Sequence, residues 1–313
     1  GISVSDGMST NTSGTSNFIA GVNAGNSIAS GGNYNTVVGD EAGTAITTGD
    51  NNVAVGYGAG KAVTTAVQNV LIGYNAGDAL NTGSINVAIG NNALSADTKG
   101  ARSVAIGYET LQNQNFTSDT SVYNTAVGGQ AGKQITTGVN NTLIGGLAGD
   151  ALTDADYNTA VGFEALSTDV LGSRSVAIGF NALHLQNFTT ATNTYNVGVG
   201  FNAGQQITTG VNNTLIGGLA GDAITTGGSN TAVGQASLTT LTTASFNTAM
   251  GLNSGLVLTT GADNTLIGVS SGASLTTGTL NVALGRNALA AGATTNKNVA
   301  IGNNTLQSVS ASS

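Results

Sequence analysis

Residues capable of covalent or metal chemistry are scarce in this chain of 313 residues. It has no cysteine, one histidine (His184) and only 7% charged residues. The missing cysteines exclude disulfides, thiolate nucleophiles and thiolate metal sites, and a single histidine excludes paired-histidine mechanisms. We therefore expect no enzyme active site, no metal centre and no cofactor, with His184 in a surface loop.

The carboxylates do not form a recognisable site either. The acidic group Asp150, Asp154, Asp156 and Glu164 lacks the spacing and the invariant glycine of a calcium-binding loop, so solvated turns are expected. Glu109 and Glu164 share one register of the repeat described below, three coils apart. That separation, about 14 Å along a stack of strands, is too large for the paired carboxylates of a polysaccharide-cleaving enzyme.

Charge and hydropathy exclude two classes of partner. The formal net charge is −8, and the seven Lys and Arg residues are scattered from Lys61 to Lys297. No basic patch could neutralise a run of phosphates, so nucleic acid is not an expected partner. No apolar stretch approaches the ~20 residues that a membrane-spanning helix needs, so membrane insertion is not expected.

A repeat of about seventeen residues organises the chain. The pentad Asn-[Thr/Val]-[Ala/Leu]-[Val/Ile]-Gly and its variants occur seventeen times between Asn17 and Gly302. Their glycines are spaced by 17 residues, with one interval of 18 and two of 21. The intervals of 21 begin at Gly107 and Gly179, 72 residues apart. Such a period predicts a stacked solenoid in which each coil has a short strand, a glycine turn, a second short strand and another turn.

Both faces of the first strand are apolar. The residue before the motif glycine is aliphatic, as in Val55 and Ile72, and we expect this row to fill the core of each chain. The residue before it points to the opposite face, and we expect that face to pack against other copies of the chain, because a strand apolar on both sides is normally buried on both sides. The predicted subunit interface consists of Ala54, Leu71, Ala105, Leu143, Leu215 and Leu266.

One core position is predicted to be filled from two alternative places in the coil. Four residues after the motif glycine comes Gly in ten coils and Leu in seven. Every Gly coil carries an aliphatic residue three positions later, as in Gly43 with Ile46, whereas Leu94 is followed by Asp97. An empty or overfilled layer would each cost about 1–3 kcal/mol or more, so the exchange is a packing rule.

Two further columns follow from the repeat. The asparagine that opens each motif, replaced by Ser103 and Ser175, is expected to form an amide ladder along the stack. A glycine ten residues after the motif glycine, as at Gly49, recurs in ten coils, and we expect it to need a positive φ.

The pentads Ser103–Gly107 and Asn298–Gly302 resemble the head repeats of trimeric autotransporter adhesins. Asn-Thr-Ala-Val-Gly at Asn124 and Asn-Asn-Thr-Leu-Ile-Gly-Gly-Leu-Ala-Gly at Asn140 are more similar to bacteriophage tail-fibre proteins. The resemblance implies an all-β, left-handed parallel β-solenoid (β-roll) of seventeen coils, assembled as a homotrimeric fibre. We expect the solenoid to span residues 17–306, between connecting segments 1–16 and 307–313.

The expected function is a rigid trimeric shaft of a phage tail fibre, located in the virion. Its partners would be copies of itself, other tail or fibre proteins and a host cell-surface glycan or protein. The alternative is the head of a bacterial surface adhesin. An ice-binding solenoid is a third reading, because Thr-Thr pairs such as Thr208-Thr209 could align on one face.

Two insertions of four residues interrupt the period, within residues 112–123 and 184–195. Loops on a rigid scaffold often carry binding residues, and the expected receptor or glycan contacts are Phe116, Tyr123, His184, Phe188 and Tyr195. The alternative is that each insertion is a passive bulge or changes the fibre geometry. Both loops are expected to project and to be dispensable for folding. Eleven of the fourteen aromatic residues directly follow the motif glycine or precede the motif asparagine, which indicates regular stacking or a sugar-binding stripe.

Overall fold

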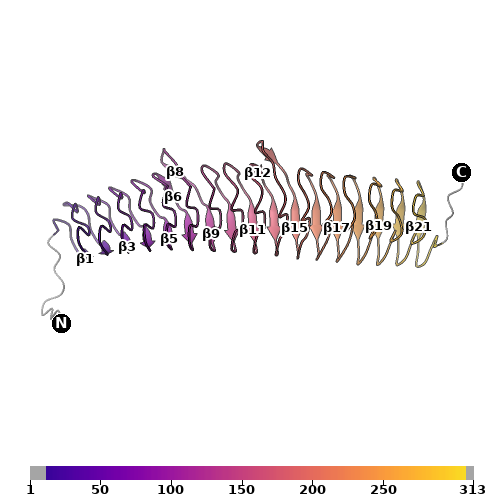
Figure 1. The fold of residues 1–313 in the computed structure, drawn as a ribbon, viewed down its shortest axis with the longest axis horizontal. Helices are drawn as coiled ribbons and strands as arrows, with labels where there is room; N and C mark the ends of the chain where they lie inside the picture. The colour runs from indigo at the N-terminus through magenta and orange to yellow at the C-terminus, as the bar shows by residue number, and fades with distance from the viewer. Residues whose placement is uncertain (1–11, 308–313) are drawn as a thin grey trace, which may run out of the picture. The chain divides into compact units, whose positions relative to one another are not determined.

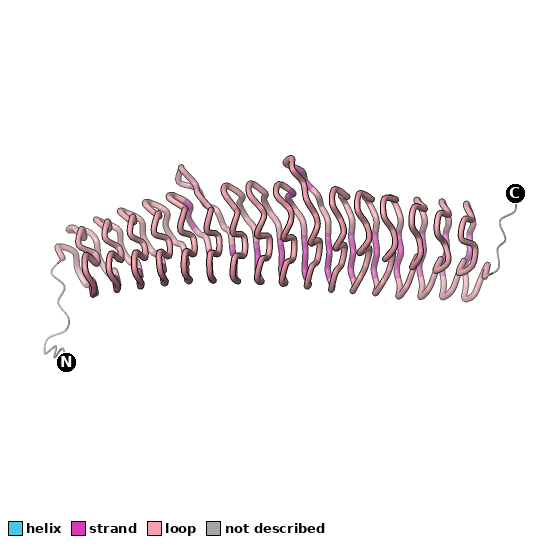
Figure 2. The backbone as a smooth tube through the Cα atoms, in the orientation of Figure 1, coloured by secondary structure: helices cyan, strands magenta, loops and turns pink. Residues whose placement is uncertain are grey.

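The computed structural model describes residues 12–307, all of whose regular secondary structure is β-strand. The predicted all-β parallel solenoid is confirmed, in two compact units that divide after Asp154. The parts of the expected connecting segments at 1–11 and 308–313 lie outside the described residues. Figures 1 and 2 show the coils of each unit, every one with its strand on the same side of the coil.

The described part of the first unit, residues 12–154, contains eight three-residue coil strands. They are β1 (Phe18–Ala20), β2 (Thr36–Val38), β3 (Val53–Val55), β4 (Val70–Ile72), β5 (Val87–Ile89), β7 (Val104–Ile106), β9 (Thr125–Val127) and β10 (Thr142–Ile144). Neighbouring strands pair in parallel and in register, so that Ala54 lies beside Leu71 and Leu71 beside Ala88. Each residue of the repeat therefore stacks on its equivalent in the next coil.

The second unit contains nine coil strands in the same arrangement. They are β11 (Thr159–Val161), β13 (Val176–Ile178), β15 (Val197–Val199), β16 (Thr214–Ile216), β17 (Thr231–Val233), β18 (Thr248–Met250), β19 (Thr265–Ile267), β20 (Val282–Leu284) and β21 (Val299–Ile301).

The expected second strand of each coil is mostly absent. Within residues 12–307, four two-residue strands lie outside the main rows: β6 (Gly100–Ala101) pairs with β8 (Thr120–Ser121), and β12 (Gly172–Ser173) pairs with β14 (Thr192–Asn193). Elsewhere this side of the coil consists of turns and bends. Its backbone is still bonded between coils, for example from Thr47 N to Thr64 O at 2.9 Å.

The assignment of the two strand faces was wrong. The central residue of every coil strand except β1 is buried in its own chain, and the residue before the motif glycine points outward and is half-buried or exposed. All six predicted interface residues (Ala54, Leu71, Ala105, Leu143, Leu215 and Leu266) belong to this core, at 0–1% exposure. A partner chain cannot reach them.

The core of each coil is thin, and large side chains at one position fill the space that glycines leave at another. A Cβ added at Gly60 would lie 2.7 Å from Leu71 Cδ1, and one at Gly77 would lie 2.8 Å from Leu71 Cδ2. Leu71 thus occupies the space above two glycines. The predicted exchange between Leu and Gly is confirmed, since Ile46 in a Gly coil and Leu94 in a Leu coil are both fully buried.

The asparagine ladder is also confirmed. Asn52 Oδ1 accepts from the backbone N of Asn69 at 3.0 Å, and Asn52 Nδ2 donates to Ala66 O at 2.8 Å. These buried amides connect consecutive coils and satisfy backbone groups that water cannot reach.

The glycine ten residues after the motif glycine was expected to need a positive φ, but it is required because a side chain there would collide with the next coil. Of these glycines Gly31 has a φ in the left-handed region, whereas Gly49 does not. A Cβ added at Gly49 would lie 2.4 Å from Ala66 O of the next coil. The constraint on this column is the close approach of neighbouring coils.

Candidate functional site

The outer face of the coil strands is an exposed apolar surface. Its first column, directly before the motif glycine, holds Val, Ile, Leu or Met in every coil strand except β1, which has Ala20, and the exposures of Ile216 and Met250 are 40% and 41%. Its second column, two residues earlier, is mainly Thr and Val. We call these two columns the outer strand face. Among the described coil strands, no charged residue occupies either column.

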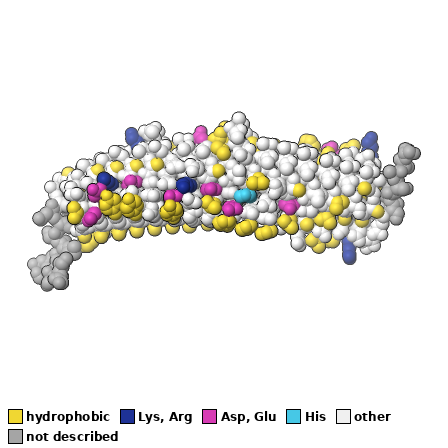
Figure 3. All heavy atoms as spheres, viewed as in Figure 1, with side chains coloured by type: hydrophobic (Ala, Val, Ile, Leu, Met, Phe, Trp, Pro, Cys, Tyr) yellow, Lys and Arg dark blue, Asp and Glu magenta, His cyan; other side chains and the backbone are white. Residues whose placement is uncertain are grey.

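Stacked aromatic rings extend this surface at the corner after the motif glycine. Tyr57 and Tyr74 stack with ring centroids 5.4 Å apart, and Phe180 stacks between Phe163 and Phe201 at 5.9 and 5.5 Å. Figure 3 shows hydrophobic side chains gathered along one edge of the molecular surface. A sugar ring would need an open aromatic face, but these rings turn their faces toward each other. The geometry therefore favours the stacking interpretation for this column.

Each insertion rises from its unit as a projecting loop, as Figures 1 and 2 show near β8 and β12. The tips are residues 117–119 and 189–191, all exposed. Two predicted contact residues do not belong to these surfaces, because Phe116 and Phe188 are each only 7% exposed and close the loop base. The prediction that they meet a receptor was wrong for this reason.

Beneath each loop lies a buried polar network that the sequence reading missed. Gln186 Nε2 donates to Asp169 Oδ2 at 2.5 Å and to Ser175 Oγ at 2.8 Å, and Gln186 Oε1 accepts from Asn196 Nδ2 at 2.8 Å. Asp169 Oδ1 accepts from the backbone N of Phe188 at 2.9 Å. The glutamine thus replaces the ladder asparagine that is missing at position 175.

The first loop repeats this network. Gln114 Nε2 donates to Asp97 Oδ2 at 2.6 Å and to Ser103 Oγ at 3.0 Å, and Asn124 Nδ2 donates to Gln114 Oε1 at 2.9 Å. Asp97 Oδ1 accepts from the backbone N of Phe116 at 3.1 Å. The loop bases are therefore structural. The expectation that the insertions are dispensable for folding still applies to the exposed tips, but it does not fit the hydrogen-bonded bases.

His184 takes part in a small polar cluster without catalytic geometry. Its Nδ1 lies 2.7 Å from Ser167 Oγ and 3.9 Å from Glu164 Oε2. A nucleophilic triad needs the serine on one ring nitrogen and the carboxylate on the other, whereas here both approach Nδ1. His184 is part-buried, so it is not a prominent loop residue.

The two remaining predicted contacts, Tyr123 and Tyr195, lie at the surface at the foot of their loops, with exposures of 53% and 52%. Each meets an arginine that the sequence reading did not single out. Arg102 Cζ lies 5.7 Å from the Tyr123 ring centroid, and Arg174 Cζ lies 6.0 Å from that of Tyr195. Both arginines occur directly before the ladder serines, a signal visible in the sequence.

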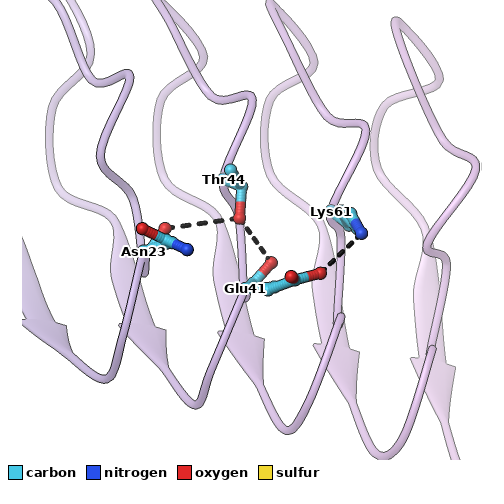
Figure 4. Close-up of polar contacts among 4 residues, drawn as sticks. All are labelled: Asn23, Glu41, Thr44 and Lys61. Atoms are coloured by element: carbon cyan, nitrogen blue, oxygen red, sulfur yellow. Dashed lines mark hydrogen bonds and ion pairs between the residues drawn. The ribbon is translucent and has the colours of Figure 1, made fainter.

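Several charges are paired between coils. Lys61 Nζ lies 2.5 Å from Glu41 Oε2, while Thr44 Oγ1 donates to the carbonyls of Glu41 and Asn23 (Figure 4). Lys133 donates to Glu109 at 2.7 Å, and together with hydrogen bonds from Gln130 and Tyr108 it lowers the pKa of Glu109 to about 2. Burial raises the pKa of Asp78, Asp169 and Asp222.

The ice-binding hypothesis depends on whether the hydroxyls of the Thr-Thr pairs are free to order water. Thr208 Oγ1 donates to Thr225 O at 3.3 Å, and Thr225 Oγ1 donates to Thr242 O at 3.2 Å. In these two Thr-Thr pairs the first hydroxyl is therefore directed to the next coil, which leaves its proton unavailable for ordering water.

Within residues 12–307, no three side chains of His, Cys, Asp or Glu lie close enough to hold a metal ion. No helix that could span a membrane occurs in that part of the chain. No protein-family model, curated protein or solved structure matches the sequence or the fold.

Proposed function

We propose that this chain is a structural segment of an adhesive fibre, of the kind that the tail-fibre resemblance implies. Copies of the chain pack together through the outer strand face, and the projecting loops contact a target surface. The observation that carries this proposal is the outer strand face itself, an uncharged and largely aliphatic surface that continues from coil to coil. Soluble monomers rarely leave contiguous apolar patches larger than a few hundred Å² in water.

The repeat argues that the partner is another copy of the chain. A surface that repeats once per coil, about every 4.8 Å, is matched over many coils only by a partner with the same axial spacing. A second copy meets this condition by construction. The left-handed coil and the phage origin rest on the resemblance alone. The number of three copies rests on it too, because burial of the outer strand face requires a partner but does not fix how many copies assemble.

Sedimentation equilibrium of the purified chain at micromolar concentration tests the proposal. The chain mass is 30.5 kDa, and we expect a species of three times this mass with a β-rich circular dichroism spectrum. A folded monomer over the whole concentration range would contradict self-association. A stable dimer would retain the assembly surface but contradict three-fold closure.

A further inference from the structure

The foot of the second projecting loop holds an arginine between two tyrosines. Arg174 Cζ lies 5.2 Å from the ring centroid of Tyr157 and 6.0 Å from that of Tyr195. Arg174 Nη1 donates to Asn193 Oδ1 at 2.7 Å. The two rings lie near the guanidinium in neighbouring coils, and Asn193 on β14 fixes its rotation, so the group is held before any ligand arrives.

This guanidinium has unused binding capacity. An arginine side chain has five N–H donors, and in the described part of the chain only Asn193 accepts one of them. Arg174 is exposed, and none of the described carboxylates lies within ion-pair distance of it, whereas Lys61 and Lys133 are both paired. An uncompensated cation that is already oriented is the arrangement that recognises an oxyanion.

The surroundings indicate what carries that oxyanion. The tyrosines present hydroxyl groups, Asn193 carries a side-chain amide beside the guanidinium, and the tip of the adjoining loop exposes Thr189 and Thr190. Such a hydroxyl- and amide-rich surface suits a ligand with many hydroxyls. We propose that Arg174, Tyr157, Tyr195 and Asn193 form a binding site for the carboxylate of an acidic sugar chain. The proposal rests on the proposed function for its biological role, because it names what the second loop would contact.

The first loop supplies a natural comparison. Arg102 contacts one ring, Tyr123, because the residue at the place of Tyr157 is Ile85. Ser121 stands where the second loop has Asn193, and Arg102 has no side-chain hydrogen bond to it in the described structure. Arg102 therefore lacks both the second ring and the orienting carbonyl, and it should bind the same ligand more weakly.

NMR titration of the Arg174 Nε–H signal in the full chain, at 0.15 M salt, tests this site. The probes are a hyaluronan oligosaccharide, which carries glucuronate, a neutral maltose oligosaccharide of equal length, and inorganic phosphate. We expect the glucuronate probe alone to shift the signal. Because the Arg174 variants lack this signal, the affinity of every variant for the glucuronate probe is measured by isothermal titration calorimetry. Arg174→Gln should weaken binding at least about tenfold, and Arg102→Gln by less than about twofold. Arg174→Lys should also lose most of the affinity, because an ammonium cannot make the two parallel hydrogen bonds.

Three results would overturn the site: no binding of the glucuronate probe, equal binding of the neutral probe, or unchanged affinity in Arg174→Gln. Phosphate that displaces the oligosaccharide at equal concentration would overturn the assignment to a sugar. Sedimentation of Arg174→Gln separates this inference from the proposed assembly, since we expect the variant to associate as the wild type does. Circular dichroism confirms that each variant is folded.

Discussion

At the scale of single residues, the tight corners of the coil impose a left-handed backbone on side chains that rarely adopt it. The residue before each motif asparagine has a φ between about 50° and 67°, including Ile85 at 62° and Asn212 at 61°. Asparagine tolerates this region, but a β-branched side chain does not. Ile85→Asn should therefore raise the free energy of unfolding by about 1 kcal/mol, and Asn212→Ile should lower it similarly. Denaturant midpoints measure both, and a loss of stability in Ile85→Asn would contradict the backbone argument.

The acidic residues next to the core give a second residue-scale prediction. Burial raises the pKa of Asp222 above the ordinary value of 3.8 for an aspartate, while Thr239 Oγ1 donates to its carboxylate. Between 3.8 and the raised value the folded chain binds more protons than the unfolded one, so this group's contribution to stability falls as the pH rises through that window. Asp222→Asn keeps an acceptor for Thr239 and removes the half-buried charge.

We therefore expect Asp222→Asn to have a higher Tm than the wild type at pH 7, with a difference that shrinks as the pH falls below 3.8. Thermal unfolding followed by circular dichroism from pH 3 to 7 measures this. A lower Tm at pH 7 would mean that the hydrogen bond to the charged form outweighs the desolvation. Glu109 has the opposite sign: its stabilising effect is present above pH 4.5 and is lost as the pH falls toward about 2.

At the scale of elements, the insertions consist of a structural base and a free tip. Gln114 satisfies Asp97, Ser103 and Asn124 within the core, so Gln114→Ala would leave buried polar atoms without partners. Each such atom costs about 1–3 kcal/mol, and we expect a clear fall in the denaturant midpoint. Ser118→Ala, at the exposed tip, should change stability by less than about 0.5 kcal/mol. Equal effects of the two substitutions would show that the base network is unimportant.

The repeat, the amide ladder and the Leu–Gly exchange could be predicted because each follows from spacing in the sequence. The two strand faces could not be told apart from hydropathy, since both are apolar. The sizes of residues at different positions of the repeat do distinguish the two faces. Leucine occupies the strand centre only at Leu71, Leu143, Leu215 and Leu266. At each of these places, the same coil and the preceding coil both have Gly four residues after the motif glycine, which leaves room for the leucine. A large side chain at one position that always occurs with small residues at another indicates that both positions lie in the same core. The Gln114 network and the Arg174 contacts depend on side-chain positions that the repeat spacing does not specify, although the sequence does place Arg174 directly before a ladder serine.

At the scale of the whole molecule, the proposed assembly would depend on the outer strand face, whereas folding depends on the inner one. In the second unit, Ile178 and Ile216 point outward, while Leu215 is fully buried and lies 2.7–2.8 Å from where Cβ atoms at Gly204 and Gly221 would be. An aspartate at an outer position remains hydrated in a single chain but would be buried without a partner in an assembled one, which costs several kcal/mol.

The double variant Ile178→Asp with Ile216→Asp should therefore remain folded but sediment as a monomer. Leu215→Asp, which places a charge inside the chain's own core, should lose the β-sheet signal in circular dichroism at any concentration. Analytical ultracentrifugation and circular dichroism on the same samples distinguish the two effects. If the outer double variant assembled as the wild type does, the copies would have to meet through another surface, and the exposed aliphatic columns would need a different partner with the same axial spacing.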